Sequence, residues 1–546
     1  MKEYNVILKK DVDYDGFWED METETEGLLY IPNRRIDYTN ERPGSLRQCW
    51  YNLTDEEAEI VRQDPRVLAV EIPPEHRDDL IIGIRKIQEG VFTKTTSDSG
   101  NYQNWGLIRA KSATNNYGTG TTTSEDYVYN LDGTGVDIVI QDSGIQTDHP
   151  EFEDENGVSR FVSVDWGAVH GGFTQNVNHD RDYDGHGTHC AGIAAGKTFG
   201  WAKNARIHHQ KINGLEGSTD SGTGISPSYA FDAIKLWHNA KPINPETGVR
   251  RPTVVNMSWG YLSTYTTVSS INYRGTSYGG VDVDTTSERE NNYGLPTAYY
   301  QITPSVIYAS NIRIASVDTD IEELLDAGVH VCVAAGNRAH KIDEYGGVDY
   351  NNYAVTSGGN AGTFYYHRGS SPYGDAAQDG SPRAIIVGNA DSTVYSSTLD
   401  QKATSSETGP GVDIYAPGTN IMSCTSTTNK WGSGSQNYYL NSSYKQTNIS
   451  GTSMASPQVA GVACLLLQMN PKLTPAQLKT KLIERAGTAF YDTGVNNDWS
   501  NFRSLKGGDN YYLNCNFDVN ADTQQTPIEF VGNGLTMSIP ISFINQ

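Results

Sequence analysis

Four residues of the types used in nucleophilic catalysis stand at the ends of predicted regular elements: Asp142, His186, Asn337 and Ser453. A hydroxyl attacks a carbonyl when a base removes its proton, and an imidazole serves as that base when a carboxylate orients it. An amide N–H stabilises the negative charge that develops on the attacked oxygen. These residue types together predict nucleophilic catalysis, provided that the fold brings them to one place.

Ser453 lies at the start of a predicted helix. Gly451 permits a tight turn, and the small, apolar run that ends near Met469 is typical of a buried helix. Pro457 is compatible with this helix, because N–H groups of the first turn make no intrahelical bonds. Those N–H groups and the positive end of the helix dipole would face a negative charge forming beside Ser453. A small-residue turn before a helix is more often only a packing device, so the interpretation depends on its partners.

Buried elements are also predicted to position the other three residues. The β-branched run 136–141 predicts a strand that ends at Asp142, and residues 331–335 predict a strand that delivers Asn337. His186 stands between glycines at the head of a small-residue helix. Coincidence of all four groups at element ends is improbable, so the sequence favours a catalytic site.

These motifs resemble those of the subtilisin-type serine proteases, whose triad also runs in the order Asp, His, Ser along the chain. Residues 104–109 (Asn-Trp-Gly-Leu-Ile-Arg), the pair His189-Cys190 and residues 196–200 (Gly-Lys-Thr-Phe-Gly) are similar to the proteinase K branch of that family. The resemblance extends over residues 100–490, with gaps. It implies a serine endopeptidase that acts on polypeptide substrates and needs no cofactor for its chemistry.

In such an enzyme Ser453 is the nucleophile, His186 is the base that later protonates the leaving amine, and Asp142 orients the imidazole. Asn337 is expected to donate its side-chain N–H to the oxyanion, together with the backbone N–H of Ser453. Taken alone, an asparagine after Ala-Ala-Gly would be interpreted as a turn residue, and the context reverses that interpretation.

Two further segments are expected to bind substrate, which would lie between them as an added strand. Ser258, Trp259 and Gly260 match the Ser-x-Gly segment of the family, and Gly222, Thr223 and Gly224 would lie on the other side. Trp259 is expected to line the specificity pocket. The alternative for this tryptophan is ordinary core packing.

The resemblance to proteinase K also implies a structural calcium ion, held by the Asp413 carboxylate and the backbone carbonyls of Pro382 and Ala384. Oxygen ligands suit this ion, and a site there would brace the segment near the pocket.

Two other groups of candidate metal ligands give weaker signals. Residues 180–185 begin like an EF-hand loop, but Ala191 occupies the position that requires glutamate. These acids are expected to solvate the loop before His186, with a weaker cation site left as an alternative. His208 and His209 lie on a predicted strand, and structural roles are favoured because no spaced third ligand is evident.

The N-terminal residues 1–72 predict a β-α-β-β-α-β unit, which is a small α+β, ferredoxin-like arrangement. This unit resembles the inhibitory propeptide of secreted subtilases, especially at residues 64–71 (Asp-Pro-Arg-Val-Leu-Ala-Val-Glu). By that resemblance residues 73–99 are a linker with the processing site, and the polar stretch 93–100 suits cleavage. A permanent accessory domain is the alternative.

Between residues 100 and 517 we expect an α/β peptidase domain, with a parallel sheet covered by helices on both faces. Strands are predicted near 136–141, 206–212, 253–257, 329–334 and 384–388, and helices after His186 and at 226–240, 318–327, 453–469 and 474–486. Polar insertions at 261–316, 339–380 and 425–446 are expected at the surface. Residues 518–546 are expected to form a C-terminal β extension.

Composition and the N-terminal residues limit the classes of binding partner and the cellular location that we expect. The chain has 546 residues and a net charge of −24, from 41 basic and 65 acidic residues, which disfavours nucleic acid and anionic membranes as partners. The first residues lack the apolar core of a signal peptide, so an intracellular or virion-associated protein is expected. The six cysteines are expected to be free thiols rather than disulfides.

The sequence thus predicts a serine endopeptidase made as an autoprocessed zymogen, with its own N-terminal domain as an intramolecular inhibitor. The alternative is a structural or virion-associated protein that carries a subtilase domain, with an assembly partner and with activity restrained by an uncleaved N-terminal domain.

Overall fold

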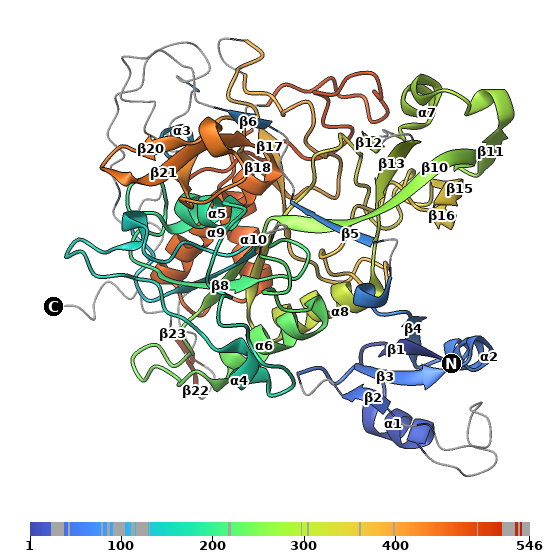
Figure 1. Cartoon of the computed structure of the whole chain (residues 1–546), viewed down its shortest axis with the longest axis horizontal. Coiled ribbons are helices and arrows are strands. Elements are labelled where there is room, and N and C mark those ends of the chain that lie inside the picture. The colour runs from blue at the N-terminus through green and yellow to red at the C-terminus, as the bar shows by residue number, and fades with distance from the viewer. Residues whose placement is uncertain are drawn as a thin grey trace.

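The computed structural model describes residues 1–22, 36, 38–41, 44–77, 80–84, 88–90, 104–110, 115, 129, 131–216, 220–295, 298–302, 305–359, 362–396, 399–488, 490–515, 530–532 and 535–537. Its central body carries a parallel sheet between helices, and a separate small sheet with two helices lies beside it at the N-terminal end (Figure 1).

Short β-branched and apolar segments form the central sheet, whose six strands all run parallel. In spatial order the strands are β18 (Ile414–Pro417), β17 (Ile385–Ala390), β14 (His330–Ala334), β9 (Thr253–Met257), β7 (Asp137–Asp142) and β8 (Arg206–Lys211). Every residue of these six strands is buried except Arg206, the first residue of β8. Such burial is expected of a sheet that is covered on both faces.

Helices cover both faces of this sheet, because alternate residues of each strand point to opposite sides. On β7, Ile138 and Ile140 join the core that contains α5 (His186–Ala195) and α9 (Thr452–Met469). Val139 joins the opposite core. That core also holds residues from α6 (Pro227–Ala240) and α8 (Ala315–Asp326). The predicted α/β fold is therefore confirmed.

The N-terminal unit follows the predicted succession of elements. They are β1 (Lys2–Leu8), α1 (Tyr14–Glu22), β2 (Tyr38–Glu41), β3 (Gln48–Leu53), α2 (Asp55–Arg62) and β4 (Val67–Glu71). The sheet order is β2-β3-β1-β4, with every neighbouring pair antiparallel. Thr54 and Glu57 form a capping box at the start of α2. Residues 28–31, where the sequence also predicts a strand, lie outside the described residues.

The insertions at 261–316 and 339–380 together build a second, antiparallel sheet. Its strands are β10 (Trp259–Tyr273), β11 (Thr276–Gly279), β12 (Ala298–Ile302), β13 (Ser305–Asn311), β15 (Tyr353–Gly359) and β16 (Gly362–Phe364), joined by β5 (Leu80–Ile84) from the linker. The sheet and α7 (Thr286–Tyr293) share an apolar cluster that includes Tyr265, Ile271 and Tyr366. These insertions thus have a small core of their own.

A third sheet holds β19 (Ile421–Thr425), β20 (Gln436–Tyr438), β21 (Asn441–Ser450) and the linker strand β6 (Gln88–Gly90). The remaining elements are α3 (Trp105–Arg109), α4 (Trp166–His170), α10 (Pro475–Glu484) and the C-terminal hairpin of β22 (Phe530–Gly532) and β23 (Leu535–Met537). All six cysteines are buried and free, as predicted. Among the described residues, no helix combines the length and the apolar character needed to cross a membrane.

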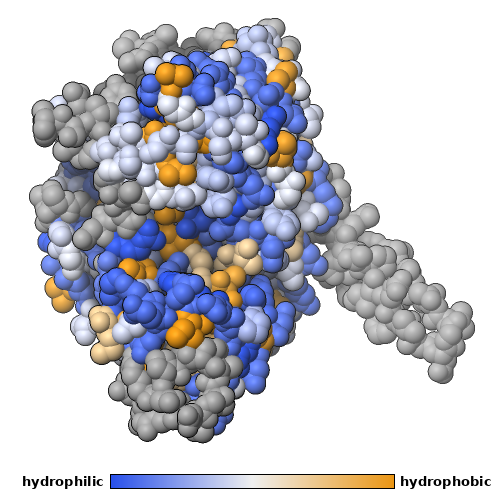
Figure 2. Space-filling model, turned by 90° about the vertical axis from the view of Figure 1, so that its right-hand side faces the viewer, coloured by the Kyte–Doolittle hydropathy of each residue, from blue (hydrophilic) through white to orange (hydrophobic). Residues whose placement is uncertain are grey.

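Figure 2 shows one face of the molecule, which is hollowed near its centre and mostly hydrophilic, with hydrophobic residues in small groups. This surface agrees with the acidic composition of the chain.

Candidate active site

The fold brings the four predicted catalytic residues to the carboxyl edge of the central sheet. Asp142 is the last residue of β7, and Asn337 follows β14, which lies two strands away in the same parallel sheet. His186 is the first residue of α5, and Ser453 is the second residue of α9. These two helices pack against each other in one core, so both of their N-termini reach this edge.

The carboxylate of Asp142 binds the imidazole of His186 directly. Nδ1 of His186 lies 2.8 Å from Oδ1 and 3.0 Å from Oδ2 of Asp142, and both side chains are buried. This contact fixes the orientation of the ring and leaves Nε2 on the opposite side. Burial raises the pKa of Asp142 to about 7, while the backbone N–H of Ser143 and the charge of Lys430 oppose the shift.

Ser453 contacts Cys190, which lies next to His186, and Ser258 of the substrate segment. The thiol of Cys190 lies 3.8 Å from His186 Nδ1 and 3.4 Å from the Ser453 carbonyl oxygen, so one sulfur links the two residues. The Ser453 hydroxyl donates to the Ser258 carbonyl at 3.1 Å, and the Ser258 hydroxyl donates to the Ser453 carbonyl at 2.9 Å. Burial raises the pKa of Cys190, which keeps this thiol protonated and leaves the hydroxyl as the candidate nucleophile.

The amide of Asn337 is oriented with its oxygen toward Thr452. Oδ1 accepts hydrogen bonds from the Thr452 backbone N–H at 2.9 Å and from its hydroxyl at 3.1 Å. Nδ2 is buried and makes no hydrogen bond within the described part of the chain. A buried amide donor that is held without an acceptor suits a negative charge that exists only during a reaction.

Asp182 corrects the expectation that the acids before His186 only solvate their loop. It is 5% exposed and accepts hydrogen bonds from the Gly185 N–H, the Thr188 N–H, the Thr188 hydroxyl and the Ser143 hydroxyl. It therefore serves as the polar cap that α5 lacks at Gly185, whose φ is 90°. Burial and the neighbouring charge of Asp184 raise the pKa of Asp182 to about 6.

Two residues that sequence reasoning missed, Thr452 and Lys430, also support the site, together with Asp182. Thr452 is adjacent to Ser453 in sequence, which is the only signal that could have identified it. Lys430 binds Asp184 at 2.6 Å from a distant loop, so no local pattern could have done so.

The structure places Ser258 and Gly260 beside an added strand. β5 pairs antiparallel with β10, with Ile84 opposite Trp259 and Gly83 opposite Gly260. The Trp259 side chain is fully buried, and its ring centroid lies 6.2 Å from that of Phe231 and 5.7 Å from that of Tyr261. Core packing, the alternative for this residue, therefore describes its observed contacts.

Lys211 binds the segment Gly222–Gly224 through a hydrogen bond to Thr223. The Lys211 ammonium group donates to the Thr223 hydroxyl at 3.0 Å and also binds Asp220. The structure records no strand pairing for Gly222–Gly224 with the described residues, so its contact with substrate stays a prediction.

The linker also pairs with the strand that leads to Ser453. β6 pairs antiparallel with β21, and Gln88 lies opposite Ser450, three residues before Ser453. The linker strand β5, which ends at Ile84, therefore pairs with β10, the strand that begins in the substrate segment. The linker strand β6, which begins at Gln88, pairs with β21, the strand that leads to Ser453.

The N-terminal unit contacts α8 through buried polar groups. Arg47 donates to Glu322 at 2.7 Å, and both side chains are nearly inaccessible to solvent. Gln48 donates to Asp320 at 2.8 Å, and Glu71 accepts a 2.9 Å hydrogen bond from the Ser316 N–H. Because α8 has no side-chain cap of its own at Ile314, Glu71 supplies one from outside the central body.

The expected calcium site requires correction. Oδ1 of Asp413 lies 2.8 Å from the Lys479 ammonium nitrogen and 3.1 Å from Arg383, and the same ammonium group lies 3.5 Å from the Ala384 carbonyl. A cationic side chain thus lies between two of the three predicted ligands, so these residues do not fit a calcium ion. The resemblance identified the oxygen donors but overlooked a lysine from α10.

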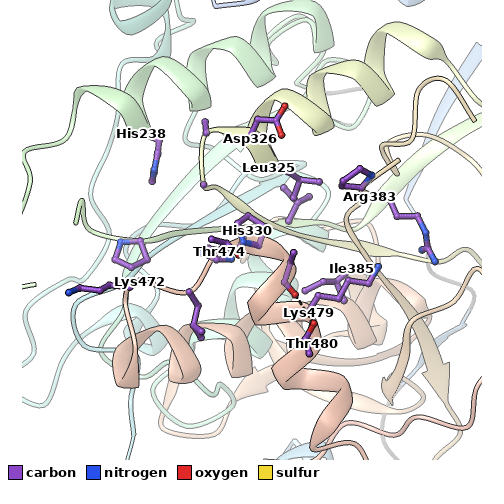
Figure 3. A pocket seen from close by; sticks show the side chains of 18 of the residues that line it. His238, Leu325, Asp326, His330, Arg383, Ile385, Lys472, Thr474, Lys479 and Thr480 are labelled. Atoms are coloured by element: carbon purple, nitrogen blue, oxygen red, sulfur yellow. Dashed lines mark hydrogen bonds between the residues drawn. The ribbon is translucent and has the colours of Figure 1, made fainter. Parts of the chain in front are cut away.

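Lys479 and Arg383 also line a cavity of about 1000 Å³ (Figure 3). The cavity is bounded by His330 and Ile385, which begin strands β14 and β17. It therefore lies at the amino edge of the parallel sheet, opposite Ser453, and is not part of the candidate active site.

The paired histidines on β8 each make a structural hydrogen bond, and His209 also lies close to His179 and Asp180. His208 Nδ1 hydrogen bonds to the Val162 carbonyl at 2.8 Å, and His209 Nε2 hydrogen bonds to the His179 carbonyl at 3.0 Å. His179 is itself engaged through both ring nitrogens, by the Lys211 N–H and by the Thr223 carbonyl. The second nitrogen of each ring lies near a carboxylate, His208 Nε2 at 3.5 Å from Asp137 and His209 Nδ1 at 3.3 Å from Asp180.

Curated relatives of this chain carry protease names. It is 27% identical to Subtilisin-like proteinase Spm1 of Pyricularia oryzae over 84% of this chain and 65% of that protein. It is 25% identical to Subtilisin-like protease 8 of Arthroderma otae over 93% and 82%, and 26% identical to Extracellular serine proteinase of Thermus sp. over 83% and 74%. The chain thus spans about two thirds of the length of the first of these relatives.

A solved structure supports the fold. Fervidolysin from Fervidobacterium pennivorans, described as a keratinolytic enzyme related to subtilisin, matches with a TM-score of 0.51 and 16% identity over 97% of this chain and 62% of that one. The sequence profile of the Subtilase family (Peptidase_S8) matches residues 133–507, which include all four predicted catalytic residues. Because this match extends over more than half of its length, the chain belongs to the subtilase family.

Proposed function

We propose that this protein is a serine endopeptidase whose catalytic residues are Asp142, His186, Ser453 and Asn337. The observation that carries the proposal is the hydrogen bond between His186 and Asp142, at the same sheet edge as Ser453. The amide donor of Asn337 is available there for an oxyanion. Family membership and the names of the relatives support the same reaction class.

The geometry supports the following sequence of steps. Rotation about the Cα–Cβ bond of Ser453 moves its hydroxyl from the Ser258 carbonyl toward His186 Nε2, which accepts the proton as Oγ attacks the substrate carbonyl. Asn337 Nδ2 and the Ser453 backbone N–H bind the oxyanion. His186 then gives its proton to the leaving amine, and a water molecule repeats the sequence to release the acyl group.

The N-terminal unit is proposed to be a prodomain that inhibits the enzyme until it is cut. In support, β5 lies where a substrate strand would add, and β6 continues beside the strand that leads to Ser453. A chain that binds both sides of the nucleophile acts as an intramolecular inhibitor. We therefore propose processing between the end of β5 at Ile84 and the start of β6 at Gln88. The cleavable stretch predicted at 93–100 lies outside the described residues.

Intact-mass analysis of the wild type and of Ser453→Ala, each treated with a fluorophosphonate probe, tests both parts. We expect the wild type to take the label and to lose an N-terminal fragment that ends in the segment 84–88. The mutant should do neither. N-terminal sequencing of the larger product identifies the cut.

Other outcomes separate the two parts of the proposal. A labelled but uncut wild type would retain the peptidase and reject processing. An unlabelled wild type, even after the N-terminal unit is removed by an added protease, would reject the catalytic role. The structural alternative predicted from the sequence would then explain the chain better.

A further inference from the structure

We propose that the antiparallel sheet built by the insertions first lengthens and then closes the edge of β10 to which substrate binds. The peptidase then recognises the backbone of an extended segment as far as the residue opposite Ser263, and gains nothing from residues beyond it. This inference rests on the proposed peptidase function and names its substrate class. The substrates are polypeptides that present, before the bond that is cut, an extended segment as long as the five residues of β5.

β5 and β15 occupy the same edge of β10. Leu262 lies opposite a residue of β13 and also opposite a residue of β5, so β13 and β5 lie on opposite edges. Tyr265 lies opposite residues of β13 and of β15, so β15 lies on the edge that β5 uses. Figure 1 shows β5 beside the first part of β10 and β15 beside its far part. The linker and the insertion at 339–380 therefore follow one another along a single edge.

The part of this edge that is left for substrate has a defined length. β5 pairs with Trp259–Ser263, and the pairing of β15 begins at Tyr265, opposite Gly359. Only Thr264 lies between the two pairings. β15 stays with the enzyme after the linker is cut, so a substrate strand that replaces β5 cannot pair with β10 beyond this point. The insertion thus ends the substrate strand.

The hydrogen bonds of Tyr261 show which residues of the edge face the substrate. Its N–H donates to the Ser371 carbonyl at 3.2 Å, and its carbonyl accepts from the Ile312 N–H at 3.4 Å. Ile312 directly follows β13, so both backbone groups of Tyr261 point away from β5. The backbone groups of neighbouring residues in a strand point to opposite edges, so those of Gly260 and Leu262 point toward β5.

Two residues of β10 therefore exchange backbone hydrogen bonds with a bound strand. Gly260 lies opposite Gly83 and belongs to the substrate segment predicted from the sequence. Leu262 lies opposite Ile81 and comes from the insertion. β13 pairs with Leu262 from the other edge, so this part of β10 is held extended whichever strand occupies the first edge. Such preorganisation lowers the entropic cost of binding.

Recognition at Leu262 depends on the substrate backbone. A proline at the position opposite Leu262 has no N–H to donate, and a peptide that ends before this position loses both hydrogen bonds. A folded region has its backbone groups already paired. The enzyme is therefore expected to favour long, unfolded segments over short peptides and folded surfaces.

Peptides with the sequence of the linker test the length of the edge. They share a C-terminus at Phe92, are acetylated, and begin at Arg77, Leu80 or Gly83. The processed enzyme is separated from its N-terminal fragment and titrated with the fluorophosphonate probe. We expect kcat/KM for the Leu80 peptide to exceed that for the Gly83 peptide by about 5- to 100-fold, because two hydrogen bonds are lost. The Arg77 peptide should lie within about 2-fold of the Leu80 peptide, because β15 blocks further pairing.

N-methylated forms of the Arg77 peptide test the backbone contact itself. A methyl group on the nitrogen of Ile81 removes the N–H that faces Leu262, so kcat/KM should fall by about 10-fold or more. The same change at Leu80 is the matched control, because this N–H points away from β10, and kcat/KM should stay within about 3-fold. Methylation of Gly83, opposite Gly260, is the positive control and should also lower kcat/KM.

Three results would overturn the inference alone. One is a loss of kcat/KM on methylation of Gly83 but not of Ile81. Another is equal kcat/KM for the Leu80 and Gly83 peptides, or an Arg77 peptide that is cut clearly faster than the Leu80 peptide. The third is an enzyme that takes the label and cuts none of these peptides. An enzyme that takes no label would instead reject the proposed peptidase function itself.

Discussion

Thr452 holds the Asn337 amide in a single orientation. Its N–H and hydroxyl both donate to Asn337 Oδ1, and its hydroxyl oxygen accepts from the Gly336 N–H at 3.1 Å. A flipped amide would place two donors against these donors, so Nδ2 must face away from α9. The residue before the nucleophile therefore positions the proposed oxyanion donor.

Replacing Asn337 by alanine should reduce kcat far more than it changes KM. The donor acts only when charge develops on the attacked oxygen, so its loss affects the transition state and not the bound substrate. We expect kcat to fall by about 10²–10³-fold, which is the range known for the loss of such a donor in subtilisin itself. Steady-state kinetics with a short peptide substrate measures it. Wild-type turnover by the Asn337→Ala enzyme would rule out the role.

Thr452→Val should lower kcat by about 3- to 10-fold, because one of the two hydrogen bonds that orient Asn337 is lost at nearly constant side-chain volume. KM should stay near the wild-type value. Thr452→Ser keeps the hydroxyl and is the matched control, with kcat within about 2-fold of wild type. If the valine and serine variants have equal kcat, the hydroxyl does not position the amide.

The sequence was sufficient to predict the residues of the site because each lies at the end of a strongly patterned element. The run before Asp142 forms a fully buried strand, and the small-residue segments that begin near His186 and Ser453 form buried helices. Their supporting residues could not be predicted in the same way. Lys430, for example, comes from a loop whose position depends on the whole fold.

The fold was predictable to the same extent. The central strands are buried on both faces, which gives a clear pattern, so five of the six were predicted near their observed bounds. β18, with only four residues, was missed. The strands of the insertion sheet are rich in Tyr, Ser and Thr and half-exposed, so their pairing with β10 leaves little trace in the sequence.

The activity should fall on acidification near neutral pH. His186 needs an ionised Asp142 beside it, and burial raises the pKa of Asp142 to about 7. As the pH falls below about 7, this carboxyl binds a proton and the fraction of competent enzyme decreases; above pH 7 the fraction approaches its maximum. A profile of kcat/KM against pH measures this acid limb.

Lys430 offers a direct test of that assignment. Its charge lowers the pKa of Asp142, so Lys430→Gln should raise this pKa and move the acid limb to higher pH. Lys472→Gln, a change at the cavity on the opposite sheet edge, is the control and should leave the profile unchanged. An unshifted or lowered midpoint in Lys430→Gln would mean that another group governs the limb.

Lys479 should stabilise the protein in the place where a calcium ion was expected. Lys479→Ala removes one of the two cationic side chains that bind Asp413 and leaves Arg383, so we expect the free energy of unfolding to fall by about 1–3 kcal/mol. Denaturant unfolding in a Ser453→Ala background measures this change without self-digestion.

The response to calcium distinguishes the lysine from an ion at this position. In the Ser453→Ala parent, a chelator should not reproduce the loss caused by Lys479→Ala, because the ammonium group already binds the Asp413 and Ala384 oxygens. In the Lys479→Ala variant the Ala384 carbonyl loses its cationic partner and Asp413 keeps Arg383, so added calcium should increase stability more than it does in the parent. If calcium stabilises the parent as much as the variant, the ammonium group does not replace the ion.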